Sequence, residues 1–154
     1  MIRIFTTIFT FIALNTICFS QYFYLPSSSN GNPGGLNTDS EYPSGSGLDA
    51  SWNILLPPGN TTPTWSSIAT IPFPFNFNGL PVSSYKVSSS GVLTFTTTAT
   101  TVPGFNNATI PDPAIPDKSI MTWGIEGTGS NDAIATKVFG TSGSQQLWVF
   151  FSSF

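Results

Sequence analysis

Few side chains in this chain could carry chemistry, and the commonest catalytic types are missing. The sequence has no histidine, and its one cysteine, Cys18, lies within an N-terminal segment typical of an export signal. The absence of histidine excludes Ser/His/Asp and Cys/His nucleophilic catalysis, histidine-based zinc or iron sites and the usual general base. No phosphate-binding loop of the G-x-x-x-x-G-K-S/T type occurs. The sequence therefore predicts a protein that is not an enzyme.

Carboxylates are the remaining groups for catalysis or metal binding. The part of the chain expected to fold contains Asp112, Asp117, Glu126 and Asp132. A carboxylate pair could serve glycoside hydrolysis, but these residues lie in or beside predicted turns, where such side chains bond to the backbone. Their oxygens could also bind calcium, although their spacing fits no EF-hand loop. We expect no cofactor, with calcium at Asp112, Asp117 and Asp132 as the alternative.

Tryptophans raise the possibility of a carbohydrate-binding module that stacks sugars on exposed rings. The sequence holds four: Trp52, Trp65, Trp123 and Trp148. Three of them fall within alternating apolar runs, which predict packing in a core. Trp65 lies instead among proline, threonine and serine neighbours. It is the residue that we expect to be exposed as a glycan platform.

The elements that must position these side chains are β-strands. Between residues 71 and 77, isoleucine and phenylalanine alternate with proline and asparagine at the two-residue period of a half-buried strand. Pro72 and Pro74 lack an N–H on the same lateral side, which predicts a sheet edge there. Asn78-Gly79 then supplies a turn that tolerates positive φ, so a hairpin should follow. We expect the alternating apolar rings to pair with that neighbour and face the core.

The same two-residue alternation of apolar and polar residues predicts further strands. Residues 52–56, 119–125 and 133–139 alternate, whereas residues 145–151 are apolar on both faces, which predicts a central strand. Four prolines between Thr97 and Lys118 predict a long crossover between sheets, a Greek-key trait. The fold class is therefore all-β, an antiparallel sandwich of Greek-key or jelly-roll type. A central strand so near the end predicts a domain that is incomplete at its C-terminus.

The N-terminal residues and the charge balance indicate export. Residues 1–20 combine Arg3, an apolar run too short for a membrane span and small residues before Gln21, as in a cleaved signal peptide. Cleavage would remove Cys18, so the product could form no disulfide. Its three lysines and seven acidic residues carry a net charge of −4 and include no basic patch for nucleic acid. We expect a secreted or outer-surface protein with no nucleic-acid partner and no membrane span after cleavage.

The composition divides the chain into three parts. Residues 1–20 are the signal peptide, residues 21–47 are a flexible leader rich in glycine, serine and asparagine, and residues 48–154 are the truncated β-sandwich domain.

Several motifs together allow a family resemblance to be stated. They are GNPGGLN at 31–37, IPFPFNFNG at 71–79, KVSSSGVLTF at 86–95, GTGSND at 127–132 and WVFF at 148–151. This set resembles the N-terminal region of large exported Bacteroidetes proteins, which typically end in a type IX secretion sorting domain not found in this chain. The central hairpin also resembles nidogen-like extracellular β-domains.

The resemblance implies a structural or adhesion role in a larger exported protein, with a glycan or a cell-surface protein as the partner. A carbohydrate-binding module is the alternative, and part of a secreted enzyme with a downstream catalytic domain is the third.

Overall fold

The computed structural model describes residues 31–39, 50–105, 112–122, 125–127 and 132–152. The chain divides into two compact units, Met1–Pro33 and Gly34–Phe154, and the architecture below belongs to the second. The predicted signal peptide, most of the predicted leader and Trp123 lie outside the described residues. In the part that is described, no helix has the length and apolar character needed to cross a membrane.

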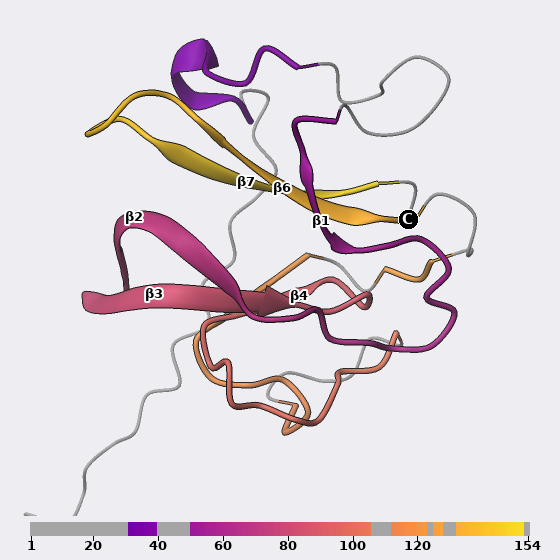
Figure 1. Ribbon diagram of the computed structural model, residues 1–154. Helices are drawn as coiled ribbons and strands as arrows, with labels where there is room; N and C mark the ends of the chain where they lie inside the picture. Colours follow the sequence, from indigo (N-terminus) through magenta and orange to yellow (C-terminus); the bar gives the residue numbers. More distant parts are fainter. Residues whose placement is uncertain (1–30, 40–49, 106–111, 123–124, 128–131, 153–154) are drawn as a thin grey trace, which may run out of the picture. The chain divides into compact units, whose positions relative to one another are not determined.

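The described elements are almost all strands (Figure 1). In chain order they are η1 (Pro33–Gly35), β1 (Asn53–Leu56), β2 (Ala69–Phe77), β3 (Leu80–Val87), β4 (Val92–Thr94), β5 (Ser119–Met121), β6 (Ile134–Phe139) and β7 (Gln146–Phe151). They form two antiparallel sheets, one in the order β1-β6-β7 and one in the order β2-β3-β4-β5. Figure 1 shows the two as separate layers. The predicted all-β antiparallel sandwich is confirmed.

The core lies between the two sheets. Its buried apolar side chains come from β1, β2, β3 and β6: Leu56, Ile71, Tyr85, Val87 and Ile134. Alternation explains the choice, because residues two apart on a strand share a face. The hydroxyl of Tyr85 in β3 donates to Thr136 Oγ1 in β6 at 3.1 Å, so a buried polar contact also joins the sheets.

Among the described strands, β2 is an edge strand, as the prolines predict. β2 is the outermost strand of its sheet, and its hairpin with β3 closes through Asn78 and Gly79, at φ 50° and 76°. Two successive positive φ values are those of the tight turn that suits the strand twist. The β2–β3 register shifts between Thr70 and Phe75. The shift spans both prolines, which have no N–H to donate to the ladder.

Two expectations for β2 need correction. Phe73 falls within the register shift and has no paired residue among those described, whereas Phe75 and Phe77 do pair with β3. Phe75 is 38% exposed and therefore does not face the core fully. Its ring lies 5.8 Å from that of Phe95, in a small aromatic group near the hairpin end of the strand. Of the four alternating apolar residues, Ile71 is buried, Phe73 and Phe77 are half-buried and Phe75 is exposed, a difference that periodicity cannot predict.

The predictions for the later strands were wrong in three respects. The proline-rich segment is no crossover, because β4 and β5 on either side of it pair directly in one sheet. Strand β5 ends at Met121 rather than at residue 125. Strand β7 is half-buried along its length and pairs only with β6 among the described strands, so it is an edge strand there rather than a central one.

Candidate functional site

The outer face of the β1-β6-β7 sheet carries a group of rings that we call the aromatic cluster: Trp52, Phe139, Trp148 and Phe150. The Trp52 ring centroid lies 5.9 Å from that of Phe139 and 5.9 Å from that of Phe150. The Phe139 and Trp148 rings are 6.1 Å apart and nearly perpendicular. Phe139 is buried, and the other three rings are half-buried.

The strand register places this cluster on the face opposite the core. Lys137 pairs with Trp148, and Thr136 pairs with Val149, which packs against the core. Because neighbours along a strand point to opposite faces, Lys137 and Trp148 point outward. The β1–β6 register of Asn53 with Thr136 continues outward to Trp52 beside Lys137. Trp52, just before β1, therefore forms a row with Lys137 on β6 and Trp148 on β7.

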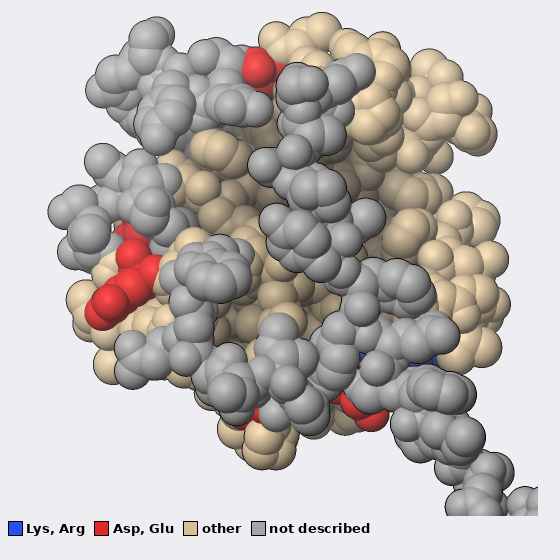
Figure 2. Space-filling view, turned by 180° about the vertical axis from the view of Figure 1, so that it is seen from behind, with Lys and Arg blue, Asp and Glu red and all other residues tan. Residues whose placement is uncertain are grey.

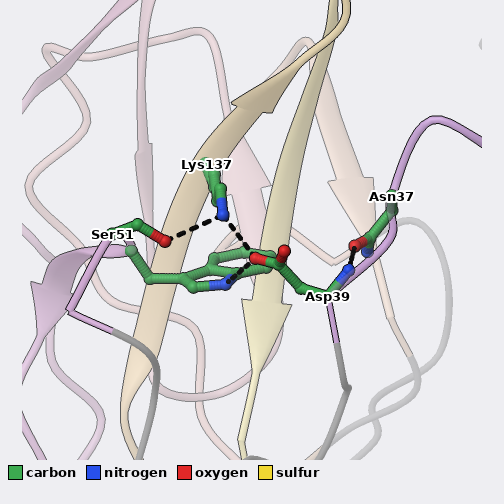
Figure 3. A network of polar contacts seen from close by, with 5 residues as sticks. Asn37, Asp39, Ser51 and Lys137 are labelled. Carbon is green, nitrogen blue, oxygen red and sulfur yellow. Dashed lines mark hydrogen bonds and ion pairs between the residues drawn. The ribbon is translucent and has the colours of Figure 1, made fainter.

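A polar network fixes one edge of this row (Figure 3). The indole N–H of Trp52 donates to Asp39 Oδ2 at 3.0 Å, and the same oxygen forms a salt bridge with Lys137. The Lys137 ammonium also donates to Ser51 Oγ at 2.8 Å. The backbone N–H of Asp39 donates to Asn37 Oδ1, which sets the local turn. Asp39 belongs to the predicted leader, yet it bonds to residues at β1 and on β6.

Sequence reasoning placed Trp52 and Trp148 in the core, and this was wrong. Neither belongs to the set of residues that packs between the sheets. The run from 146 to 150 contained the signal for an aromatic outer face. Its glutamine, tryptophan and phenylalanine form one face of the strand, and Leu147 and Val149 form the other. Apolar residues on both faces were interpreted as a buried strand, although an aromatic outer face produces the same pattern.

Trp65 is half-buried and well anchored. Its backbone bridges to Ser88, and its indole N–H donates to the carbonyl of Thr101 at 2.9 Å. The Lys86 ammonium lies 4.6 Å from the ring centroid and also donates to the carbonyl of Ala99. Burial lowers the pKa of Lys86. Nothing in this geometry tests glycan binding at Trp65, which stays a prediction.

The predicted calcium ligands lie in different local settings. Asp112 Oδ1 accepts the backbone N–H of Ala114 at 2.8 Å, which is a turn contact, and Asp117 is exposed. Asp132 is fully buried, and its Oδ1 accepts the N–H of Gly59 at 2.9 Å. Among the described residues, no three acidic or cysteine side chains gather where they could hold a metal ion. The calcium site stays a prediction.

The buried Asp132 carboxylate is unusual in one respect. Its Oδ2 has no hydrogen-bond partner among the described residues. Gly127 lies against this oxygen so closely that a Cβ there would be 2.0 Å away. Position 127 therefore requires glycine, because any side chain there would collide with the Asp132 carboxylate.

A cavity of 570 Å³ lies between the β1 and β2 strands. Its lining mixes aliphatic side chains with hydroxyl and amide groups, and Ser51 and Lys137 belong both to this lining and to the polar network. Of the lining residues, only Tyr85 and Lys137 carry titratable groups. Burial raises the pKa of Tyr85, and its hydrogen bond to Thr136 acts in the opposite direction. The lining therefore contains no carboxylate for general acid catalysis.

The wider surface is sparsely charged. On the face shown in Figure 2, most of the described surface is uncharged and the acidic atoms lie in small separate groups. Contacts on this surface would therefore rest on apolar, aromatic and neutral polar groups more than on ion pairs.

Comparison with known proteins gives one family. The sequence model of the NIDO-related family matches residues 58–154, which include all strands from β2 to β7. No match came from the comparison with curated proteins or from that with solved structures. The nidogen-like resemblance of the hairpin is thus confirmed at the level of the family. Because the match covers more than half of the chain, this protein belongs to the nidogen-related (NIDO-related) family of extracellular, non-catalytic domains.

Proposed function

We propose that this chain is an adhesion domain of a larger exported protein and that it contacts its partner through the aromatic cluster. The single observation that carries this proposal is that Trp52, Trp148 and Phe150, each half-buried, lie on the face of the sheet away from the core. Buried rings would serve stability alone. Rings held partly in solvent keep apolar area available for a partner, and aromatic residues are enriched in protein interfaces.

The cluster is also suitably rigid. Trp52 contacts two neighbouring rings and donates its indole N–H to Asp39, so its orientation is set before any partner arrives. A preorganised contact surface loses less side-chain entropy on binding than a mobile one does. The sheet beneath it supplies the rigid support that a binding site needs.

The route to the surface is part of the same proposal. The N-terminal pattern supports cleavage before Gln21, and the motif resemblance supports a type IX secretion product of the Bacteroidetes kind. Intact-mass measurement of the exported protein tests the first step. Retention of Cys18 in the mature chain would contradict it.

Adhesion itself can be tested with beads coated with the exported chain. Adherence to a panel of cell surfaces and polysaccharide films is counted for the wild type, for Trp148→Ser and for Ile120→Ser. Ile120 is an exposed apolar residue on β5 of the other sheet and so serves as the matched control. We expect adherence that falls with Trp148→Ser and persists with Ile120→Ser. No adherence to any surface, or equal loss in both variants, would contradict the proposal.

A glycan-binding role is the second candidate. Two sites support it: the aromatic cluster, and Trp65 with the Lys86 ammonium over its ring. The same bead assay on polysaccharide films, repeated with Trp65→Leu, tests whether Trp65 takes part.

A further inference from the structure

We propose that Trp52 is the stacking platform of a saccharide-binding site, with Asp39 and Lys137 as the pair that bonds the sugar hydroxyls. This inference rests on the proposed adhesion function, because it names the chemical class of the partner at the same surface. It assigns a different tryptophan from the one that the sequence favoured.

The first argument is the way in which the Trp52 ring is held. Phe139 and Phe150 lie at equal centroid distances from it and are inclined to its plane by 65° and 52°. Neither ring lies parallel to the indole, so neither is stacked on it in parallel, and both hold it in place. Trp52 is half-buried, and the N–H edge of its ring is held by Asp39. A braced indole of this kind offers a flat apolar surface, which suits the C–H face of a sugar ring.

The second argument is the polar pair at the ring edge. A carboxylate has about four lone-pair positions and an ammonium has three donors. The described contacts use Asp39 Oδ2 for Trp52 and Lys137, and direct the ammonium to Asp39 and Ser51. Asp39 Oδ1 accepts none of these bonds, and the ammonium also lies 4.9 Å from the Phe139 ring centroid. The pair therefore places an acceptor beside a cationic donor. Vicinal sugar hydroxyls, each both donor and acceptor, match this pair.

The charges of Asp39 and Lys137 favour neutral saccharides over acidic ones. Asp39 and Lys137 are in direct contact and have opposite charges, so the pair is neutral as a unit. An acidic sugar would gain from Lys137 but would be repelled by Asp39. A neutral saccharide avoids this conflict, and it is the ligand class to which we commit.

Trp65 fits this role less well, although it is half-buried to the same class as Trp52. The Lys86 ammonium lies over its ring at 4.6 Å from the centroid, whereas Lys137 stands 6.0 Å from the Trp52 centroid. A cation that close occupies one face of the indole. The Trp65 N–H is bonded to a backbone carbonyl rather than to a side chain that could also bond a ligand.

The row across the sheet can extend the site. Trp52, which directly precedes β1, and Trp148 on β7 stand on either side of Lys137 on β6. Neighbouring strands are about 4.8 Å apart, so these two positions are separated by roughly 10 Å. An extended saccharide lying across the strands would reach both rings.

The test uses the exported chain on an array of neutral and acidic saccharides, followed by titration with the strongest neutral binder. We expect saturable binding that weakens about tenfold or more in Trp52→Leu, since stacked rings contribute beyond their buried area. Lys137→Met should weaken binding, and Ile120→Ser, the control on the other sheet, should leave it unchanged. The fold of each variant is checked by its melting transition.

A second measurement does not depend on the variants folding. In the wild-type protein, the indole N–H resonance of Trp52 should shift during the saccharide titration while that of Trp65 stays in place. A Trp65 shift without a Trp52 shift would overturn the inference, as would an array on which the wild type binds no neutral saccharide. If the beads adhere but the protein binds no saccharide, this inference is contradicted and the proposed adhesion function is not. Beads that do not adhere would remove the adhesion function.

Discussion

Replacing Tyr85 by phenylalanine tests the buried polar contact between the two sheets. Tyr85 is 1% exposed, and its hydroxyl donates to Thr136 Oγ1, which in turn donates to the carbonyl of Trp148. The Tyr85→Phe change removes one buried hydrogen bond and leaves Thr136 Oγ1 without that donor. A lost bond with an unsatisfied partner costs about 1–3 kcal/mol. Because Thr136 keeps its bond to Trp148, we expect the lower half of that range.

Urea unfolding followed by tryptophan fluorescence measures this cost. The midpoint should fall while the urea dependence of the unfolding free energy is unchanged, since the surface exposed on unfolding is almost the same. The double variant with Thr136→Val should be less destabilised than the sum of the two single variants, because the two hydroxyls interact. Additive effects, or a Tyr85→Phe change below about 0.3 kcal/mol, would refute the contact between the sheets.

The same variant predicts a pH dependence. Burial raises the pKa of Tyr85 in the folded protein, so the folded state keeps this proton more tightly than the unfolded state does. The resulting stability is fully present below the unfolded pKa of about 10 and is lost as pH rises through the folded value. Tyr85→Phe should lack this alkaline loss. Burial lowers the pKa of Lys86, which acts in the opposite direction, but this contribution cancels when the two proteins are compared.

Three further substitutions test the packing, each measured by denaturant or thermal unfolding. Ile134→Ala should lower the unfolding free energy by about 2–5 kcal/mol, because Ile134 is fully buried between the sheets. The control Ile68, which is 61% exposed, should tolerate alanine within about 0.5 kcal/mol. Equal costs for the two variants would contradict the burial of Ile134 in the core. Gly127→Ala should cost about 1–3 kcal/mol, since its Cβ would meet Asp132, and an unchanged melting temperature would contradict that close approach. Phe75→Ala should cost below about 2 kcal/mol, less than a buried phenylalanine does, because 38% of the residue is exposed; a cost of 3 kcal/mol or more would show that Phe75 is buried.

Much of the fold could be predicted because its signals are local. The edge at β2 follows from two prolines on one lateral side, and the hairpin follows from Asn78-Gly79. The predictions were wrong where a strand pairs with a segment that is distant in the sequence. Prolines between β4 and β5 indicate a long connection, but they do not say that its two ends return to the same sheet.

The candidate site was predicted less well. The polar neighbours of Trp65 predict exposure, whereas the alternating run around Trp52 predicts burial in the core, so the pattern favours Trp65. Asp39 lies in a stretch with no periodicity, and its salt bridge joins it to a lysine 98 residues away. No local pattern contains that contact.

Sequence alone determined that this is a histidine-free, all-β, sparsely charged domain whose strands alternate, because period, turn chemistry and composition are properties of neighbouring residues. Tertiary structure decided which face of each strand meets the other sheet. Alternation shows that Trp148 and Phe150 share a face, but not which face is covered. That choice depended on where the opposite sheet packs, and it left Trp52, Lys137 and Trp148 together on the outer surface.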